Sequence, residues 1–196
     1  MTGSIDPSRE AFEDGLPPID PRARWPHDES LHAWWVLPGR LLAGEHPELD
    51  GEDGIEERLR LLADAGIVTT IDLAGRGMPE GGYGRDWLEL GQMLGRDHRR
   101  LVRPIDDRGV IGDDGFRALL ADIDAELATG RPTFVHCAFG VGRTGMTVGV
   151  WLRHRGLDFD ATMARIADAR AGTRRANWTC PDTPAQLAAI RAAGPA

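Results

Sequence analysis

Apolar residues recur every three or four positions in several stretches of the chain, and this spacing places them on one face of a helix. Between residues 52 and 65 they fall on Ile55, Leu59 and Leu62, and Gly66 follows as a stop signal. The same pattern predicts helices over residues 113–127, 146–152 and 159–169, a short one around 87–93, and a last one that begins near Thr183 or Pro184.

Shorter apolar runs alternate with these helices and predict strands. They cover residues 33–37, 40–43, 67–71, 98–102 and 131–136. Only Pro38 and Gly39 separate the first two runs, so we predict that these two strands form an edge hairpin. Because strands otherwise alternate with helices, we predict an α/β fold with a central, mostly parallel, twisted sheet of about four to five strands and helices on both faces. Ligands bind at the carboxyl ends of the strands in such folds.

The first thirty residues differ in composition from the rest. They contain five prolines among many charged and small residues, and such a composition buries little apolar surface. We therefore predict a flexible N-terminal arm over residues 1–30 and a single domain over residues 31–196, which is long enough for one sizeable core. Trp25 is the arm residue that would dock on the domain or meet a partner.

The chain carries 31 acidic and 23 basic residues, which gives a formal net charge of −8. This balance argues against nucleic acids and anionic membrane surfaces as partners, so any anion site must be local. No stretch approaches the roughly 18 apolar residues of a membrane span, and the pattern of a signal peptide is missing. With only Cys137 and Cys180, no disulfide scaffold is indicated, and a cytoplasmic location is expected. The sequence does not indicate an oligomeric state.

The segment over residues 136–145 joins a predicted strand to a predicted helix and has two interpretations. Gly140, Gly142 and Gly145 form a G-x-G-x-x-G pattern, which is typical of dinucleotide-binding turns in this context. That fingerprint also needs an acidic residue about twenty positions later, at the end of the next strand. Asp158 lies near that distance, but it falls where a helix is predicted to begin.

The second interpretation uses residues that the first leaves without a role. Cys137 ends the strand, Arg143 follows six positions later, and Thr144 comes next. A loop of this length can point successive backbone N–H groups at one tetrahedral anion, while the following helix adds its positive end. Arg143 would bind two phosphate oxygens, and Cys137 would attack the phosphorus as a thiolate that the same donors stabilise. The phosphate-binding positions predicted in this way are Ala138, Phe139, Gly140, Val141, Gly142 and Arg143.

At these residues the sequence resembles the signature of the protein tyrosine phosphatase superfamily, which is His-Cys, five residues, then Arg and Ser or Thr. The compact size is similar to that of the dual-specificity branch, and residues 35–44 resemble the opening of its small bacterial members. The resemblance covers residues 33–193 in outline. It implies a phosphomonoester hydrolase that works through a phosphocysteine intermediate and needs neither a metal nor another cofactor.

The resemblance also implies a carboxylic acid on a separate loop, because the departing oxygen has to be protonated. Residues 104–107 read Pro-Ile-Asp-Asp and are similar to the family's Pro-Ile-x-Asp loop. This makes Asp107 the expected general acid and Asp106 the close alternative, unless both are simply solvated loop residues. Ile111 stands where many relatives carry proline, so the loop departs from the family pattern there.

Further positions have an expected place near the site. The resemblance implies that Gln186 can position the hydrolytic water, although the sequence itself favours an exposed helix position for it. It also implies that His136 is a buried support of the loop and not a base. Asp72 and Arg76 follow a predicted strand and either rim the site or belong to a solvated loop.

The remaining histidines show no metal-binding spacing with carboxylates or cysteines, so no metal site is predicted. They are His27, His32, His46, His98 and His154. The expected partner is a phosphate monoester, either a phosphotyrosine protein or a small phosphorylated metabolite, because the loop lacks the extra lysines that would suit a polyphosphorylated inositol. The alternative function is a non-catalytic module that binds phosphate or a dinucleotide.

Overall fold

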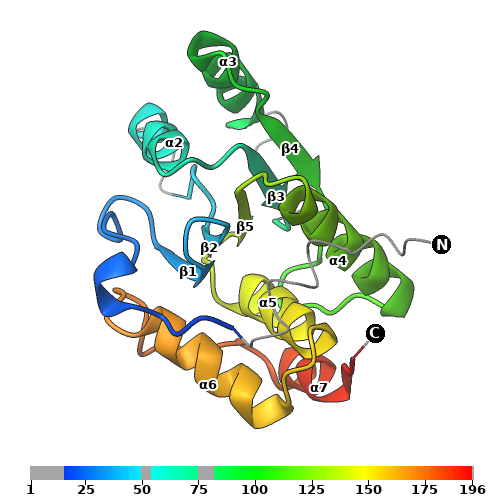
Figure 1. Cartoon of the computed structure of the whole chain (residues 1–196). Helices are drawn as coiled ribbons and strands as arrows, with labels where there is room; N and C mark the ends of the chain where they lie inside the picture. Colours follow the sequence, from blue (N-terminus) through cyan, green and yellow to red (C-terminus); the bar gives the residue numbers. More distant parts are fainter. Residues whose placement is uncertain (1–15, 50–53, 75–81, 196) are drawn as a thin grey trace, which may run out of the picture.

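The structure, a computed structural model, describes residues 16–49, 54–74 and 82–195. Its centre is a five-stranded sheet in the order β1-β2-β5-β3-β4 (Figure 1). The strands are β1 (Ala33–Leu37), β2 (Leu41–Glu45), β3 (Thr69–Asp72), β4 (Arg99–Val102) and β5 (Thr133–Cys137). β1 pairs with β2 in the antiparallel sense at one edge, and the other neighbouring strands are parallel. The predicted edge hairpin and mostly parallel sheet are therefore confirmed.

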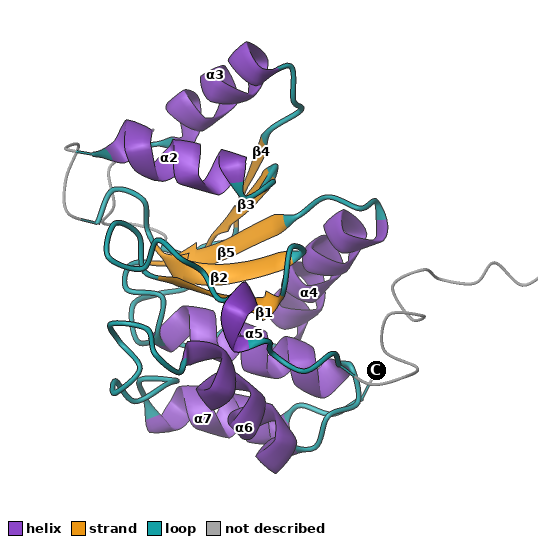
Figure 2. Ribbon diagram, turned by 60° about the vertical axis from the view of Figure 1, so that its left-hand side comes forward, coloured by secondary structure: helices purple, strands orange, loops and turns teal. Residues whose placement is uncertain are grey.

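Helices cover both faces of this sheet. After the short 3-10 helix η1 (Pro21–Ala23), they are α2 (Ile55–Asp64), α3 (Gly84–Leu94), α4 (Asp113–Ala128), α5 (Gly142–His154), α6 (Phe159–Arg170) and α7 (Pro184–Ala192). Figure 2 shows α2 and α3 on one face and α4 to α7 on the other. The predicted α/β class with two helical layers is confirmed. Among the described helices, each is too short or too polar to cross a lipid bilayer.

Two apolar cores, one on each face of the sheet, follow from the alternation of side chains along the central strand. Phe134 of β5 shares a core with Leu62 of α2 and Trp87 of α3. Its neighbour Val135 belongs to the other core, together with Met146 of α5. Because both faces are covered, β5 is apolar at successive positions, as strands of parallel sheets usually are.

Several element boundaries differ from the predictions, and two of the shifts change elements that reach the carboxyl edge of the sheet. The strand predicted over residues 67–71 runs instead from Thr69 to Asp72, and the helix predicted over residues 146–152 already begins at Gly142. Both shifts occur next to the carboxyl edge of the sheet. Apolar periodicity misses these ends because the residues that extend them are polar or glycine.

The described part of the predicted arm, residues 16–30, lies against the domain. Ile19 and Trp25 are buried, and the indole N–H of Trp25 donates a hydrogen bond to the carbonyl oxygen of Leu31 (2.8 Å). The ring of Trp25 also lies edge-on to that of Trp35, with 6.4 Å between the centroids. Trp25 therefore docks on the domain. The prediction for residues 1–15 falls outside the described residues.

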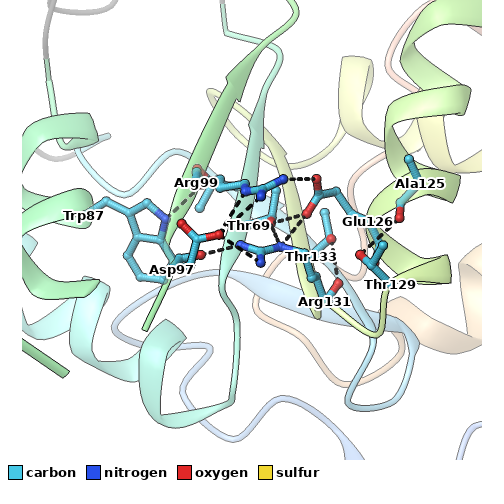
Figure 3. A network of polar contacts seen from close by, with 10 residues as sticks. Thr69, Trp87, Asp97, Arg99, Ala125, Glu126, Thr129, Arg131 and Thr133 are labelled. Carbon is cyan, nitrogen blue, oxygen red and sulfur yellow. Dashed lines mark hydrogen bonds and ion pairs between the residues drawn. The ribbon is translucent and has the colours of Figure 1, made fainter. Parts of the chain in front are cut away.

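At the end of the sheet opposite Cys137, a carboxylate of α4 connects the beginnings of three strands (Figure 3). Glu126 accepts hydrogen bonds from the hydroxyl of Thr69 (2.6 Å) and from Nε of Arg131 (2.8 Å), and it pairs with Arg99 (3.4 Å). Glu126 is buried, and hydrogen bonds to charged groups contribute about 1.5–3 kcal/mol. The network fixes the amino ends of β3, β4 and β5, whose carboxyl ends lead to the candidate site.

Candidate active site

The carboxyl ends of β2, β3 and β5 lie side by side and bring Glu45, Asp72 and Cys137 to one edge of the sheet. A cavity of about 390 Å³ opens at this edge. The predicted residues that line it are Asp107, Cys137, Phe139, Val141, Gly142, Arg143 and Gln186. The structure thus brings together the phosphate loop (residues 137–143), the acid loop (residues 103–112) and the beginning of α7.

The phosphate loop is shaped by its close contact with β2. Gly140 has a φ of +70°, and a Cβ at this position would lie 2.5 Å from the carbonyl carbon of Gly44. The backbone N–H of His46 donates to the carbonyl oxygen of Ala138 (3.0 Å). Conformation and space therefore both require glycine at position 140. The loop passes directly into α5 at Gly142, so the positive end of this helix meets the cavity.

The dinucleotide-binding alternative lacks its acidic partner. Asp158 caps α6, because its carboxylate accepts a hydrogen bond from the backbone N–H of Ala161 (2.7 Å). Within the described ranges, no strand follows β5 along the chain. The described residues therefore offer no strand end for the acidic residue of the dinucleotide fingerprint. Gly140 instead allows the phosphate loop to lie close to β2.

Arg143 is a buried cation at the base of the cavity, with 5% of its surface exposed. Its Nη1 donates to the carbonyl oxygens of Leu73 (3.4 Å), Ala74 (2.8 Å) and Ile105 (3.1 Å). Its Nη2 lies 3.0 Å from Oδ1 of Asp107. The guanidinium is thus fixed in one orientation, and a fixed planar fork suits bidentate binding of phosphate oxygens.

The two candidate acids occupy different positions in the acid loop. Asp107 lines the cavity and contacts Arg143, whereas Asp106 does not line it. The carbonyl oxygen of Asp106 instead accepts a hydrogen bond from the N–H of Gly109 (2.8 Å) and closes a turn. Within this turn Arg108 has a φ of 59°, a left-handed conformation that residues other than glycine rarely adopt. The turn leaves Asp107 at the cavity.

Two exposed aromatic side chains, Phe139 and Trp178, form an aromatic rim around part of the cavity. They are 48% and 50% exposed, and their ring centroids are 6.2 Å apart. The guanidinium of Arg175 lies 5.5 Å from the first centroid and 5.2 Å from the second. Arg175 also donates to the carbonyl oxygen of Phe139 (2.7 Å) and pairs with the buried Glu45 (2.6 Å). A buried carboxylate therefore holds the cation that supports the rim.

A buried polar cluster lies beside the end of β5. Nε2 of His136 is 2.6 Å from the hydroxyl of Tyr83, and Arg100 donates to the carboxylate of Asp72 (2.6 Å). The ring of His46 packs edge-on against that of His136, with 5.0 Å between the centroids. Burial lowers the pKa of His46 to about 3 and that of His136 to about 4. Both imidazoles are therefore neutral at neutral pH.

The donor atoms of His46, Asp72 and His136 lie within 4.8 Å of one another, a grouping that their separation in sequence did not indicate. Two imidazoles and a carboxylate are a common set of metal ligands. Here, however, Arg100 binds the carboxylate of Asp72, so a metal ion would meet the charge of the guanidinium. The cluster fits an internal salt bridge with two neutral histidines better than a metal centre.

Gln186, for which the sequence favours an exposed position, is fully buried. Its side chain completes a capping box with Thr183 at the beginning of α7, where both hydrogen bonds measure 3.2 Å. Its Nε2 also donates to the carbonyl oxygen of Gly109 in the acid loop (3.2 Å). The expectation of exposure was wrong, because the weak periodicity of a short helix does not show what its first turn packs against.

Three other predicted positions have different outcomes. Thr144 is buried, and its hydroxyl donates to the carbonyl oxygen of Gly44 (3.4 Å). Asp72 was expected on the rim or in a solvated loop, and it is instead buried in the cluster with His136. Burial of a charged group next to a strand end is possible there because Arg100 neutralises it. Arg76 lies outside the described residues.

Comparison with known proteins agrees with this architecture. A family model described as "Swiss Army Knife protein, DSP-PTPase phosphatase domain" matches residues 32–188, which is most of the chain. The chain belongs to this DSP-PTPase family. It is therefore a cysteine-based phosphatase of the dual-specificity and tyrosine phosphatase type.

Solved structures of several phosphatases share the fold of this DSP-PTPase domain. Kinase associated phosphatase, with its catalytic-site cysteine replaced by serine, aligns with a TM-score of 0.64 at 17% identity, over 82% of this chain and 92% of that one. Tk-PTP in its active form gives 0.61 at 21% identity, over 81% and 93%. TpbA from P. aeruginosa gives 0.59 at 19% identity, over 90% and 88%. At such identities the likeness establishes the fold.

Sequence analysis did not indicate the residues that support this DSP-PTPase site from outside the motif. Glu45 ends a strand whose other residues are apolar or glycine. An acidic residue at the end of such a strand is the one sequence signal that could have identified Glu45 as part of the site. His46, Arg100 and Arg175 carry no comparable signal. They reach the site only because the sheet and the loop before α7 bring distant segments together.

The stability of this DSP-PTPase domain should fall between pH 7 and pH 5. The pKa of His46 and that of His136 are lowered from 6.5 to about 3 and about 4 in the folded state. The unfolded chain therefore binds more protons between these values and 6.5, so stability is lost as the pH falls through this window. We expect the free energy of unfolding in urea to drop by about 1–3 kcal/mol at pH 5.

Two variants separate this effect from general acid sensitivity. His46→Gln should lose a substantial part of the pH dependence, because one of the two neutral imidazoles is gone. His27→Gln, at an exposed position, should keep all of it. An unfolding free energy that is the same at pH 7 and pH 5 would contradict the neutral state of the buried pair.

Proposed function

We propose that this DSP-PTPase domain hydrolyses aryl phosphate monoesters, with phosphotyrosine in proteins as the substrate class, through a phosphocysteine on Cys137 and without a metal. One observation carries the proposal. Cys137 lines the base of a cavity in which Arg143 is fixed by backbone carbonyl oxygens and Asp107 lies 3.0 Å from that arginine. A nucleophile, an anion-binding group and an acid therefore meet at one point.

In the first chemical step, the phosphate group lies in the phosphate loop and Arg143 binds two of its oxygens. The N–H groups of the loop and the positive end of α5 stabilise the anion. The thiolate of Cys137 attacks the phosphorus, the bond to the leaving oxygen breaks, and Asp107 gives that oxygen its proton. The contact between Asp107 and Arg143 (3.0 Å) brings the carboxyl group to the anion site. Bound phosphate takes its place on the guanidinium, which leaves the carboxyl group beside the departing oxygen.

In the second step, water attacks the phosphorus of the phosphocysteine and gives a proton to the carboxylate of Asp107. The sulfur–phosphorus bond breaks, which releases phosphate and regenerates the thiolate. Thr144 is our candidate donor to the departing sulfur, and for this step its hydroxyl gives up the long hydrogen bond to the carbonyl oxygen of Gly44 (3.4 Å). The buried amide of Gln186 lines the cavity, which supports a role in positioning the water.

The aromatic rim supports an aryl substrate. Phe139 and Trp178 present large exposed ring surfaces at the cavity, and such surfaces gain most from contact with another ring. Loop residues Ala138, Phe139 and Val141 carry no charge, so they offer nothing to a polyphosphorylated head group. A variant of TpbA from P. aeruginosa has been crystallised with phosphotyrosine, and this agrees with the same substrate class.

The experiment that tests the proposal measures phosphate release by the full chain in the presence of EDTA. The substrates are 4-nitrophenyl phosphate, phosphotyrosine and phosphoserine peptides, and sugar and nucleoside monophosphates. We expect activity that is insensitive to EDTA, is abolished by Cys137→Ser, and has its highest kcat/KM with the phosphotyrosine peptide.

Two results would contradict parts of this proposal. A sugar or nucleoside phosphate as the best substrate would replace the substrate class with a small metabolite and leave the chemistry intact. An absence of phosphate release from every ester would point to a phosphate-binding module instead.

Asp107→Asn should lower kcat for phenyl phosphate by about 10²–10⁴-fold, because the phenoxide then leaves without a proton. The loss should be much smaller for 2,4-dinitrophenyl phosphate, whose leaving group needs no acid. Asp106→Asn is the matched control and should behave like the wild type. The reverse pattern would assign the acid to Asp106.

Trp178→Ala should raise KM for a phosphotyrosine peptide by about 2–10-fold, which is the value of one aromatic contact. KM for an alkyl ester such as glycerol phosphate should not change, because that ester offers no ring to the rim. Met93→Ala, which truncates another exposed apolar side chain on α3, is the control and should affect neither substrate. Equal increases for both esters would show that Trp178 supports the cavity without recognising the ring.

A further inference from the structure

Upstream of Asp107, the acid loop is anchored to the end of β3. The backbone N–H of Arg103 donates to the carbonyl oxygen of Asp72 (2.8 Å), and that of Ile105 donates to the carbonyl oxygen of Leu73 (3.2 Å). Ile105 is buried and also accepts a hydrogen bond from Arg143. These contacts fix the residues that lead to Asp107, but they leave the tip of the loop at residues 108 and 109 to be held by something else.

The beginning of α7 holds this tip. Nη1 of Arg108 lies 3.2 Å from Oδ2 of Asp182, which precedes the helix by two residues. Nε2 of Gln186 donates to the carbonyl oxygen of Gly109 (3.2 Å). The oxygen of the same amide accepts from the N–H of Thr183 in the capping box, so the amide has a fixed orientation. Two successive residues of the acid loop are thus bound by one short segment.

The same segment also packs on the phosphate loop. A Cβ placed on Gly142 would lie 3.1 Å from Cβ of Asp182 and 3.1 Å from Oε1 of Gln186. Gly142 therefore allows the beginning of α7 to approach the first turn of α5. Asp182 and Gln186 contact the acid loop with their polar ends, while Cβ of Asp182 and the amide of Gln186 face Gly142 of the phosphate loop.

We infer that Arg108, Asp182 and Gln186 are positioning residues that form a latch, which holds the acid loop over the phosphate loop. The inference rests on the proposed function, in which Asp107 is the general acid. Arg108 follows Asp107 directly in the chain, so any displacement of the tip moves the acid. Release of the latch lowers the fraction of molecules in which the carboxyl group reaches the leaving oxygen, and it leaves Cys137 and Arg143 in place.

The size of the effect follows from exposure. The side chains of Arg108 and Asp182 are 66% and 42% exposed, and exposed ion pairs contribute about 0.2–1 kcal/mol. This corresponds to a change of about 1.5–5-fold in rate. Gln186 is fully buried, and loss of its hydrogen bond to Gly109 should have a larger effect.

The test compares Arg108→Ala, Asp182→Ala and the double variant on two esters. For phenyl phosphate, each single variant should lower kcat/KM by about 1.5–5-fold, and the double variant should lose no more than the larger single loss. For 2,4-dinitrophenyl phosphate no variant should lose activity, because its leaving group does not need the acid. The exchanged pair Arg108→Asp with Asp182→Arg should recover activity on phenyl phosphate.

Gln186→Met distinguishes the latch from the positioning of water. If Gln186 belongs to the latch, rapid-quench measurements with phenyl phosphate should show slower release of phenol in the first turnover, because formation of the phosphocysteine needs the acid. A normal first turnover followed by a slower steady state would assign Gln186 to the water alone and remove it from the latch.

Arg117→Ala is the matched control, because Arg117 forms a comparable exposed pair with Asp114 on α4 (2.7 Å). It should affect neither ester. Equal losses on both esters, or losses that add in the double variant, would overturn the latch. Failure of the proposed function looks different, because Asp107→Asn would then show no dependence on the leaving group. If the latch variants fail these tests while Asp107→Asn still shows its dependence on the leaving group, the latch is wrong and Asp107 remains the general acid.

Discussion

The guanidinium of Arg143 joins three segments of chain at the carboxyl edge of the sheet. It belongs to the phosphate loop, and it donates to carbonyl oxygens that follow β3 and to that of Ile105 in the acid loop. One side chain therefore sets the distances between the anion site, the end of β3 and the loop of Asp107. A lysine has no planar fork and could not bind these oxygens and a phosphate in one geometry. Burial of such a cation is costly, and these hydrogen bonds offset the cost.

Two buried acids at strand ends are neutralised by arginines, and this allows a protein with a net charge of −8 to have an anion site. Asp72 at the end of β3 and Glu45 at the end of β2 are both buried close to the phosphate loop, where free carboxylates would repel a phosphate. Arg100 neutralises the first, and both Arg174 and Arg175 pair with the second. The two histidines of the cluster remain neutral and add no compensating charge. The attraction for phosphate thus comes from Arg143, the loop N–H groups and the end of α5.

Local patterns in the sequence were sufficient to predict the sheet and the helical layers. Spacing could place Cys137 and Arg143 together because both lie on one turn between a strand and a helix. It could not show that Gln186 is buried, since that depends on a contact with Gly109, 77 positions away. The grouping of His46 with Asp72 and His136 has the same origin. It depends on the pairing of β2, β5 and β3, which no local pattern encodes.

The loop between α6 and α7 supplies several of the side chains around the cavity. Within twelve positions, this loop and the first turn of α7 supply Trp178 of the aromatic rim with its support Arg175, then Asp182 and Gln186, which bind the acid loop. The form of the phosphate loop is constrained, because a Cβ at position 140 would collide with Gly44 and because three carbonyl oxygens hold the guanidinium of Arg143. The loop before α7 lines the same cavity with Trp178 and Asp182, and in the proposed mechanism these side chains lie on the side of the leaving group. Because the rim and the acid loop contact the same short segment, a change there that admits a different leaving group also shifts Asp107. In the proposed mechanism, substrate choice and proton supply are therefore coupled through this segment.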